Sequence, residues 1–185
     1  GRPEEAKQVR DPWRFEDKST GALYELTPGG ASYTRFNQVV FGKDDAGDTL
    51  TGDIYTDRLY GGAGDDFLYG KEENDHLEGG AGADTLEGGD GNDVLVGGAG
   101  IDILRGGKDR DSLRGGLERD RYEFAAGDGI DTIEDVDGLG EIKVGQDTLT
   151  GGKETAPGSG VWASADGRYR YSLVTEADGS RTLVI

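Results

Sequence analysis

Acidic side chains recur at a fixed interval through the middle of the chain. An aspartate stands at every ninth residue, and the series runs Asp48, Asp57, Asp66, Asp75, Asp84, Asp93, Asp102, Asp111 and Asp120. An apolar residue follows two positions after each one: Leu50, Leu59, Leu68, Leu77, Leu86, Leu95, Leu104, Leu113 and Tyr122. Carboxylate oxygens are the side-chain ligands that hard divalent cations prefer. The spacing therefore predicts a row of metal sites.

Glycines fill the positions before each aspartate, most completely in residues 79–84, which read Gly-Gly-Ala-Gly-Ala-Asp. Because glycine permits a positive φ, this pattern predicts a tight loop whose carbonyl oxygens turn toward one point. The chain has no Cys, and its single histidine, His76, is expected to be a surface residue, so the ligands are oxygens. Many oxygen ligands on flexible loops favour calcium over magnesium, which requires tight octahedral geometry.

The nine-residue period also predicts the elements that position these loops. The residues around each leucine, such as Val94-Leu95-Val96, favour a short strand whose middle side chain points inward. Two repeats then form one coil, with a strand on each side and a loop at each edge. Loops two repeats apart stack at the spacing of hydrogen-bonded strands, about 4.8 Å. The sequence therefore predicts an all-β fold, a parallel β-roll of the β-helix or solenoid type.

This stacking sorts the aspartates into two columns. Edge I is defined by Asp66, Asp84, Asp102 and Asp120, and edge II is defined by Asp57, Asp75, Asp93 and Asp111. Like charges this close repel by several kcal/mol per pair even at an effective dielectric constant of about 20. A divalent cation between successive loops makes that interaction favourable. We therefore expect calcium ions between the loops of each column.

The full motif, Gly-Gly-x-Gly-x-Asp-x-apolar-x, occurs in the repeats that start at Gly61, Gly79, Gly88 and Gly97. It resembles the calcium-binding repeats of the RTX family of bacterial type I secreted proteins. The resemblance covers residues 43–133, including a tenth loop that follows a two-residue slip in the frame. It implies that each ion takes the second and fourth carbonyls and the aspartate of one loop. The first and third carbonyls and the aspartate of the next same-edge loop complete the ligand set.

Carried onto this chain, the resemblance implies a ligand set for each of several ions. The first ion on edge I would use Gly62, Gly64 and Asp66 with Gly79, Ala81 and Asp84. The second would use Gly80, Gly82 and Asp84 with Gly97, Ala99 and Asp102, and the third Gly98, Gly100 and Asp102 with Gly115, Leu117 and Asp120. An ion on edge II would use Gly89, Gly91 and Asp93 with Gly106, Lys108 and Asp111. The remaining candidate ligands are Asp48, Gly61, Ala63, Gly88, Asp90 and Asp131.

Several loops depart from the glycine pattern, most of them on edge II. Tyr55 and Glu73 replace the fourth-position glycine of repeats two and four, and Lys71 replaces the second-position glycine of repeat four. A residue with a Cβ is disfavoured where a loop needs a positive φ. Asp109 and Glu118 are milder departures, because an added acid still favours a cation. We therefore predict fuller calcium occupancy on edge I.

Charge and pattern divide the chain into three regions. Residues 42–140, the RTX-like roll, hold 26 Asp and Glu against 9 Lys and Arg, which accounts for almost the whole formal net charge of −18. We expect residues 1–41 to be a leader that caps the first coil and links it to an upstream domain. Residues 141–185 alternate apolar and polar side chains between Asp-Gly turns, which predicts a small antiparallel C-terminal β cap. Its apolar end, residues 183–185, resembles a type I secretion signal.

Composition excludes several classes of partner. Low hydrophobicity with high net charge is typical of disordered chains, but the strict period favours a stacked fold. The acidic surface disfavours nucleic acid and anionic lipid. No apolar run reaches the length of a transmembrane helix. Because the chain starts at Gly1 and has no Met, we expect it to be a piece of a larger protein.

The resemblance implies a secreted, extracellular module that binds calcium. Such a chain stays unfolded in the calcium-poor bacterial cytosol, passes through the type I secretion machinery and folds outside, as part of a toxin, lipase or similar protein. The alternative is an extracellular adhesin or carbohydrate-binding module that uses an aromatic patch of Tyr60, Phe67 and Tyr69. Packing of that patch against the leader around Trp13 or Tyr33 would instead make it structural. No nucleophile–base pair is evident, so we expect enzyme activity only in an upstream part of the full protein.

Overall fold

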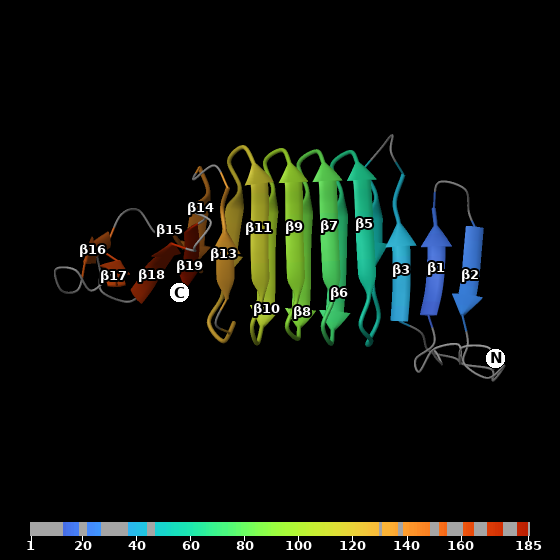
Figure 1. The fold of residues 1–185 in the computed structure, drawn as a ribbon, viewed down its shortest axis with the longest axis horizontal. Coiled ribbons are helices and arrows are strands. Elements are labelled where there is room, and N and C mark those ends of the chain that lie inside the picture. The colour runs from blue at the N-terminus through green and yellow to red at the C-terminus, as the bar shows by residue number, and fades with distance from the viewer. Residues whose placement is uncertain are drawn as a thin grey trace, which may run out of the picture.

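The computed structural model describes residues 13–18, 22–26, 37–43, 47–129, 131–136, 139–148, 152–154, 161–164, 170–175 and 181–184. Every helix or strand assigned within these residues is a β-strand. In this part of the chain, no helix is long and apolar enough to cross a membrane. The strands form two sheets that lie face to face around a core (Figure 1).

The larger sheet, sheet A, has twelve strands in the order β16-β17-β18-β19-β13-β11-β9-β7-β5-β3-β1-β2. Its central strands are parallel: β3 (Asn37–Phe41), β5 (Arg58–Ala63), β7 (His76–Ala81), β9 (Val94–Ala99), β11 (Ser112–Leu117) and β13 (Thr132–Glu134).

The smaller sheet, sheet B, has seven strands in the order β15-β14-β12-β10-β8-β6-β4. Its parallel strands are β4 (Thr49–Thr51), β6 (Phe67–Glu72), β8 (Thr85–Asp90), β10 (Ile103–Lys108), β12 (Arg121–Phe124) and β14 (Glu141–Val144). The last strand, β15 (Asp147–Thr148), is antiparallel to β14.

The chain alternates between the two sheets, so that each nonapeptide supplies one strand and the next nonapeptide supplies a strand of the opposite sheet. Leu59 pairs with Leu77, and Leu77 pairs with Leu95, in sheet A. Leu68 and Leu86 pair in the same way in sheet B. The predicted parallel β-roll, with two repeats in each coil, is therefore confirmed.

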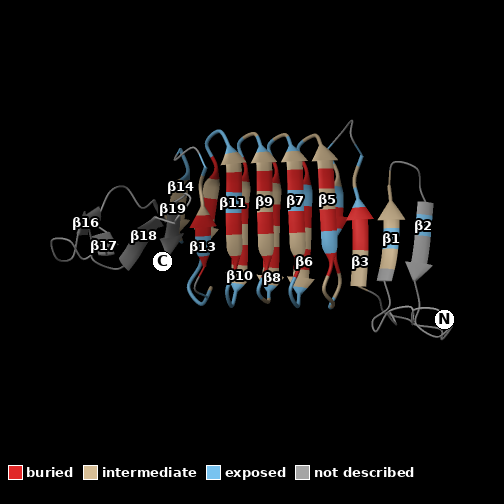
Figure 2. Ribbon diagram, in the orientation of Figure 1, coloured by how far each residue is buried: buried red, intermediate tan, exposed pale blue. Residues whose placement is uncertain are grey.

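One leucine from each repeat builds the core. The leucines from Leu50 to Leu113 are all 0% exposed, and Tyr122 continues the series at 1%. Figure 2 shows the buried residues running through the central strands of the roll. Burying one leucine contributes about 1.5–3 kcal/mol, but a leucine is covered only when the neighbouring coils are in place. Core formation therefore depends on the stacking of the loops as well as the strands.

Strands from the first part of the chain extend sheet A beyond the first coil. β1 (Trp13–Asp17) is parallel to β3, and β2 (Ala22–Leu26) is antiparallel to β1 at the end of the sheet. Lys18 Nζ donates a hydrogen bond to the Thr49 carbonyl on β4, the end strand of sheet B, at 2.9 Å. Tyr33 lies outside the described residues, and the domain boundary near residue 41 stays a prediction.

The other end of sheet A is antiparallel. β16 (Gly152–Glu154), β17 (Val161–Ser164), β18 (Arg170–Thr175) and β19 (Arg181–Val184) pair in succession, and β19 pairs with β13. The predicted antiparallel cap is therefore confirmed in these strands. The Asp-Gly turns at 166–167 and 178–179 lie outside the described residues.

The predicted aromatic patch is wrong in placing Tyr60 with Phe67 and Tyr69. Tyr60 belongs to β5 in sheet A, whereas Phe67 and Tyr69 belong to β6 in sheet B. Because successive repeats supply opposite sheets, their outward side chains lie on opposite faces of the roll. Tyr60 instead stacks on Phe41, with 5.1 Å between ring centroids, and its centroid lies 5.9 Å from that of His76.

Candidate metal centre

Each edge of the roll is a stack of loops that connect one sheet to the other. In a complete repeat the second and fourth loop residues have a positive φ, as at Gly80 (115°) and Gly82 (136°). A Cβ on Gly80 would also collide with the carbonyl oxygen of Gly62, and a Cβ on Gly82 with that of Gly64. Glycine is therefore required both by the backbone conformation and by the close approach of neighbouring loops.

Each loop aspartate bonds to the preceding loop on its edge. From Asp66 to Asp120, the Oδ1 oxygen accepts a hydrogen bond from the backbone N–H of the aspartate eighteen residues earlier. Asp84 accepts from Asp66 at 2.7 Å, and Asp102 accepts from Asp84 at 2.9 Å, on edge I. Asp93 accepts from Asp75 at 2.8 Å on edge II. These charge-assisted bonds run along both edges and fix the orientation of each carboxylate.

The second carboxylate oxygen, Oδ2, is buried and accepts no hydrogen bond from any described residue. This holds at Asp66, Asp75, Asp84, Asp93, Asp102 and Asp111. In Asp84 this oxygen lies where a Cβ on Gly79, the first residue of the same loop, would sit. A buried carboxylate oxygen without a partner is unfavourable. A hard cation would provide the missing interaction, so these aspartates fit calcium.

Backbone carbonyls complete the candidate ligand set. The carbonyl oxygens of Gly62 and Gly64 face the next loop on edge I, and those of Gly79 and Ala81 face back toward the loop before them. The Ala81 oxygen also accepts a hydrogen bond from the Gly64 N–H at 2.8 Å. The roll therefore brings together, between two loops, the carbonyls that the family resemblance implies for the first ion.

The same carbonyl orientation recurs at most of the other loops. On edge I it recurs at Gly61, Gly80, Gly82, Gly98, Ala99, Gly115 and Leu117. On edge II it recurs at Lys71, Glu73, Gly88, Gly89 and Gly106. The remaining predicted ligands of these sets, Ala63, Gly91, Gly97, Gly100 and Lys108, lie at equivalent positions of the stacked strands and loops.

Lys71 and Glu73 adopt the loop conformation that sequence reasoning treated as unfavourable for them, with φ of 94° and 69°. The pairing of β4 with β6 stops at Thr51 and Tyr69, so no strand is paired beside Lys71 on that side. The positive φ costs about 1–2 kcal/mol for a residue other than glycine. Edge II thus keeps the loop shape at the expense of backbone strain.

The first aspartates of the series differ from the later ones. Asp57 Oδ1 accepts from the Gln38 N–H, and its Oδ2 accepts from the Asp53 N–H, each at 2.6 Å. Asp48 Oδ2 accepts from the Lys43 N–H. Both aspartates therefore use Oδ2 to hold the chain around the first coil. These carboxylates have less capacity left for a cation than the later ones.

At the other end of edge II, Asp131 takes the place of a loop aspartate. Its Oδ1 accepts from the Asp111 N–H at 2.9 Å, and it is 2% exposed. The tenth loop therefore continues the aspartate series after the frame slip, as the sequence predicts. The spacing of twenty residues matches the register of β11 with β13, in which Leu113 pairs with Ile133.

Burial raises the pKa of the loop aspartates well above the usual carboxyl range. The largest shifts are on edge II, where burial raises the pKa of Asp75 and of Asp111 to about 8. On edge I, burial raises the pKa of Asp84 to about 6 and that of Asp102 to about 7. Negative neighbours in the same column add to each shift. The charged carboxylates are therefore unfavourable in the folded roll unless positive charge is near.

Other polar residues support the stack, and sequence reasoning missed their contacts. Asp65 Oδ1 accepts from the Ala83 N–H at 2.8 Å, and Asn74 Oδ1 accepts from the Asn92 N–H at 2.7 Å. Both acceptors stand one residue before a loop aspartate and eighteen residues before their donor. That spacing is the signal that could have identified them.

Two of the predicted ligands on edge II pair with each other through their side chains. Lys108 Nζ binds Asp90 Oδ2 at 2.7 Å, across an exposed part of the surface. Within the described residues, no three acidic or histidine side chains form a metal-binding cluster. Most ligands in a loop-stacked site must therefore be backbone carbonyls.

Family models match the same part of the chain. Four copies of the RTX calcium-binding nonapeptide repeat match residues 44–77, 69–104, 87–122 and 96–133. Residues 44–133 are RTX repeats. No curated protein matches the sequence. RTX repeats bind calcium, and the predicted cofactor is therefore confirmed at the level of the repeat family. In these RTX repeats a bound calcium ion would supply the positive charge that buried carboxylate oxygens such as Asp84 Oδ2 lack.

Proposed function

We propose that the RTX roll is a calcium-dependent folding module of a larger secreted bacterial protein. The observation that carries this proposal is the row of buried Oδ2 oxygens, from Asp66 to Asp111, that accept no hydrogen bond from the described part of the chain. A fold that buries several charged carboxylates is unstable until cations bind them. Calcium that binds only the folded form stabilises it by mass action. Folding and calcium binding are then one reaction.

We assign the ions to the spaces between same-edge loops. On edge I the first would be held by Asp66 and Asp84 with the facing carbonyls of Gly62, Gly64, Gly79 and Ala81. Asp84 and Asp102 would each serve two ions, because each lies between two neighbouring loops of its column. The carbonyl orientation and the free Oδ2 oxygens support this assignment.

Export is the second part of the proposal. Extracellular calcium modules bind calcium at roughly 10⁻⁴–10⁻³ M, far above cytosolic levels. A chain with net charge −18 and a core of one leucine per repeat would therefore stay unfolded before secretion. The unfolded chain would pass through a type I secretion channel and fold outside, where calcium is available. The family match of residues 44–133 supports this role.

A calcium titration followed by circular dichroism tests the folding claim. In excess chelator we expect the spectrum of a disordered chain, and with millimolar calcium we expect a cooperative gain of β signal. Magnesium at the same concentration is the control and should produce little signal. A chain that already has the full β signal in chelator would contradict the proposal.

Co-expression with a type I secretion system tests the export claim separately. The full chain should reach the medium, and a chain that lacks residues 141–185 should stay in the cell. Equal secretion of both chains would contradict a signal in that segment. Such a result would not affect the folding claim, which the calcium titration tests independently.

A further inference from the structure

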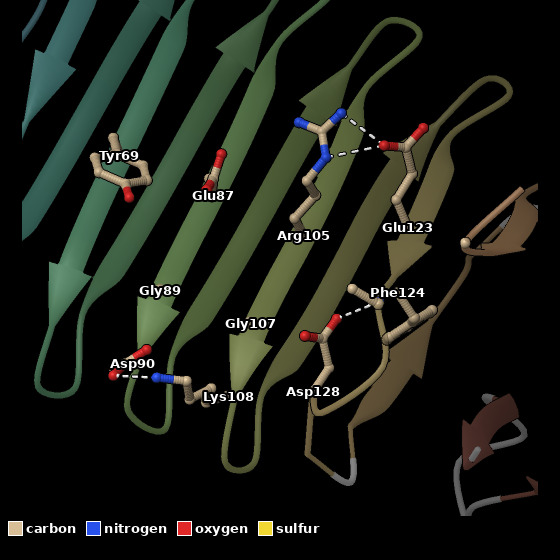
Figure 3. A pocket seen from close by; sticks show the side chains of 12 residues that line it. Tyr69, Glu87, Gly89, Asp90, Arg105, Gly107, Lys108, Glu123, Phe124 and Asp128 are labelled. Atoms are coloured by element: carbon tan, nitrogen blue, oxygen red, sulfur yellow. Dashed lines mark hydrogen bonds and ion pairs between the residues drawn. The ribbon is translucent and has the colours of Figure 1, made fainter.

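The outward face of sheet B carries a trough of about 450 Å³, which is lined by charged side chains and, on one side, by loop residues of edge II. One wall is a row of side chains at equal register on four neighbouring strands: Tyr69, Glu87, Arg105 and Glu123. Figure 3 shows this row crossing β6, β8, β10 and β12. It extends over three strand spacings, or about 14 Å.

The loop chemistry creates the hollow beside this row. Gly89 and Gly107 occupy the next outward positions on β8 and β10, and both line the trough. Both have a positive φ, 121° and 103°, because they are second-position loop glycines. They contribute no side chain, so the space above them stays open. Lys108 and Asp90 close the trough on the far side, and Asp128 lies at its end (Figure 3).

The charges that line the trough are largely satisfied by one another. Arg105 binds Glu123 through two nitrogens, Nε at 2.9 Å and Nη2 at 2.6 Å. Lys108 binds Asp90 at 2.7 Å. An anionic ligand would have to compete with these carboxylates, so the trough disfavours it. A neutral ligand that both donates and accepts hydrogen bonds can bind without breaking either pair.

Two groups in the row are free to bind such a ligand. Glu87 pairs in register with Arg105, but Arg105 bonds to Glu123 instead. Within the described residues, the Glu87 carboxylate and the Tyr69 hydroxyl have no hydrogen-bond or ion-pair partner. Tyr69 also offers a partly exposed aromatic ring beside the free carboxylate. An aromatic ring next to hydrogen-bonding groups is typical of sites for ligands with both apolar and polar faces.

From this arrangement we propose that the trough on sheet B binds a neutral oligosaccharide. A sugar ring would stack on Tyr69, its hydroxyls would donate to the Glu87 carboxylate, and the next rings would meet the Arg105–Glu123 pair. The elongated shape of the row suits a chain of sugar rings. Tyr69 and Glu87 lie on the flat face of the roll and belong to no candidate calcium ligand set, and edge II loop residues close the far side of the trough.

Sheet A provides a matched control. Tyr60 and Glu78 occupy the same repeat positions on β5 and β7 as Tyr69 and Glu87 on sheet B. In sheet A, however, Tyr60 stacks on Phe41. Glu78 is paired with Val96 on the next strand, whereas Glu87 in sheet B is paired with Arg105. The control pair therefore has the same residue types without the same row of polar neighbours.

Binding of the calcium-loaded full chain to an array of neutral, amino and acidic oligosaccharides tests the proposal. The best neutral oligosaccharide is then titrated by calorimetry. We expect Tyr69→Ala and Glu87→Gln each to weaken binding about tenfold or more, the effect of losing one hydrogen bond to a charged group or one stacked ring. Tyr60→Ala and Glu78→Gln should leave the affinity unchanged.

The proposal is overturned if no neutral oligosaccharide binds at millimolar concentration, or if only acidic or amino oligosaccharides bind. Equal losses from the sheet A and sheet B variants would also overturn it. A calcium titration of every variant by circular dichroism identifies any variant that fails to fold. Because Glu87→Gln only replaces one oxygen of a partly exposed side chain with nitrogen, it tests the site even if Tyr69→Ala does not fold.

Discussion

The two edges of the roll have the same aspartate series but differ in how tightly their loops join. On edge I the fourth-position N–H bonds to the third-position carbonyl of the next loop, at 2.8 Å from Gly64 to Ala81 and 2.9 Å from Gly82 to Ala99. Within the described residues, edge II has no equivalent bond. Its loops are joined mainly through the aspartates and the strand pairs.

Backbone strain follows the same division. Among the loop residues that the structure describes, edge II has three non-glycine residues at positive φ, which are Lys71, Glu73 and Asp109, whereas edge I has Glu118 alone. In the loop that contains Glu118, the equivalent hydrogen bond from the Gly100 N–H to the Leu117 carbonyl is longer, at 3.4 Å. The comparison teaches that the aspartates fix the column, while the glycines set how closely successive loops pack. Calcium affinity should therefore differ between edges that carry the same acids.

The largest change in folding stability should come from substitutions at the second position of the loop, made once on each edge. Gly80→Ala places a Cβ against the Gly62 carbonyl at a φ of 115°, so it should destabilise the folded roll by about 3 kcal/mol or more. Lys71→Gly, at the same position on edge II, should stabilise the roll by up to about 1 kcal/mol, because it relieves a strained φ. Urea unfolding in saturating calcium measures both. Effects of the same sign would contradict the role assigned to the glycines.

The next effect concerns the number of ions bound. Asp84→Asn should remove the two ions that this carboxylate is proposed to share, because it loses a charge and a ligand oxygen. Asp57→Asn should leave the count unchanged, because both of its oxygens already accept backbone hydrogen bonds. Native mass spectrometry in millimolar calcium counts the ions. A loss of ions from Asp57→Asn equal to that from Asp84→Asn would make the first coil a calcium site like the others.

Acid should partly replace calcium, and it should do so first on edge II. Burial raises the pKa of Asp75 from 3.8 to about 8 and that of Asp84 to about 6. A carboxyl with a raised folded pKa stabilises the fold below its unfolded pKa, and that stability is lost as the pH rises through the folded pKa. In calcium-free buffer we therefore expect the β signal to grow as the pH falls from 8 toward 4.

The same titration separates the two edges. Asp75→Asn should remove more of the pH dependence between pH 6 and pH 8 than Asp84→Asn does, because the higher folded pKa belongs to Asp75. Circular dichroism in calcium-free buffer measures the change. A β signal that is flat, or that falls as the pH falls, would contradict the unfavourable burial of these charges.

The smallest effect should come from restoring glycine on edge I. Glu118→Gly relieves a φ of 80° and should allow the Gly100 N–H to approach the Leu117 carbonyl more closely. The expected gain in stability is up to about 1 kcal/mol, with a modest fall in the calcium midpoint. Calcium titration of the variant beside the unchanged chain provides the measurement. A raised midpoint would mean that the Glu118 carboxylate itself helps to hold a cation.

Most of the architecture could be predicted from the sequence because the repeat is a regular physical unit. A leucine two residues after each aspartate gives an inward strand position, and the two-repeat coil follows from it. Gly80 and Gly82 predicted a loop with positive φ, and both residues have a positive φ in the structure. The same regularity explains why the aromatic patch was predicted incorrectly. Successive repeats belong to opposite sheets, which separates Tyr60 from Phe67 and Tyr69.

The contacts that distinguish one loop from another could not be predicted in the same way. That Asp57 uses both oxygens within the protein depends on the backbone path of Gln38 and Asp53, which lies outside the repeat pattern. The end of the pairing of β4 with β6 at Thr51 and Tyr69 also lies outside that pattern. Such local details arise where the period ends, and a periodic pattern contains no information about its own boundaries.

Anomalous diffraction from a crystal grown in millimolar calcium tests the central claim most directly. It locates each calcium ion relative to the Oδ2 oxygens and the loop carbonyls. We predict ions between the loops of Asp66, Asp84, Asp102 and Asp120 on edge I and fewer or weaker sites on edge II. On edge I the ions should lie beside the Oδ2 oxygens of Asp66, Asp84 and Asp102, which accept no hydrogen bond from any described residue. Equal occupancy on both edges would contradict the difference between them. The absence of calcium from both columns would contradict the account as a whole.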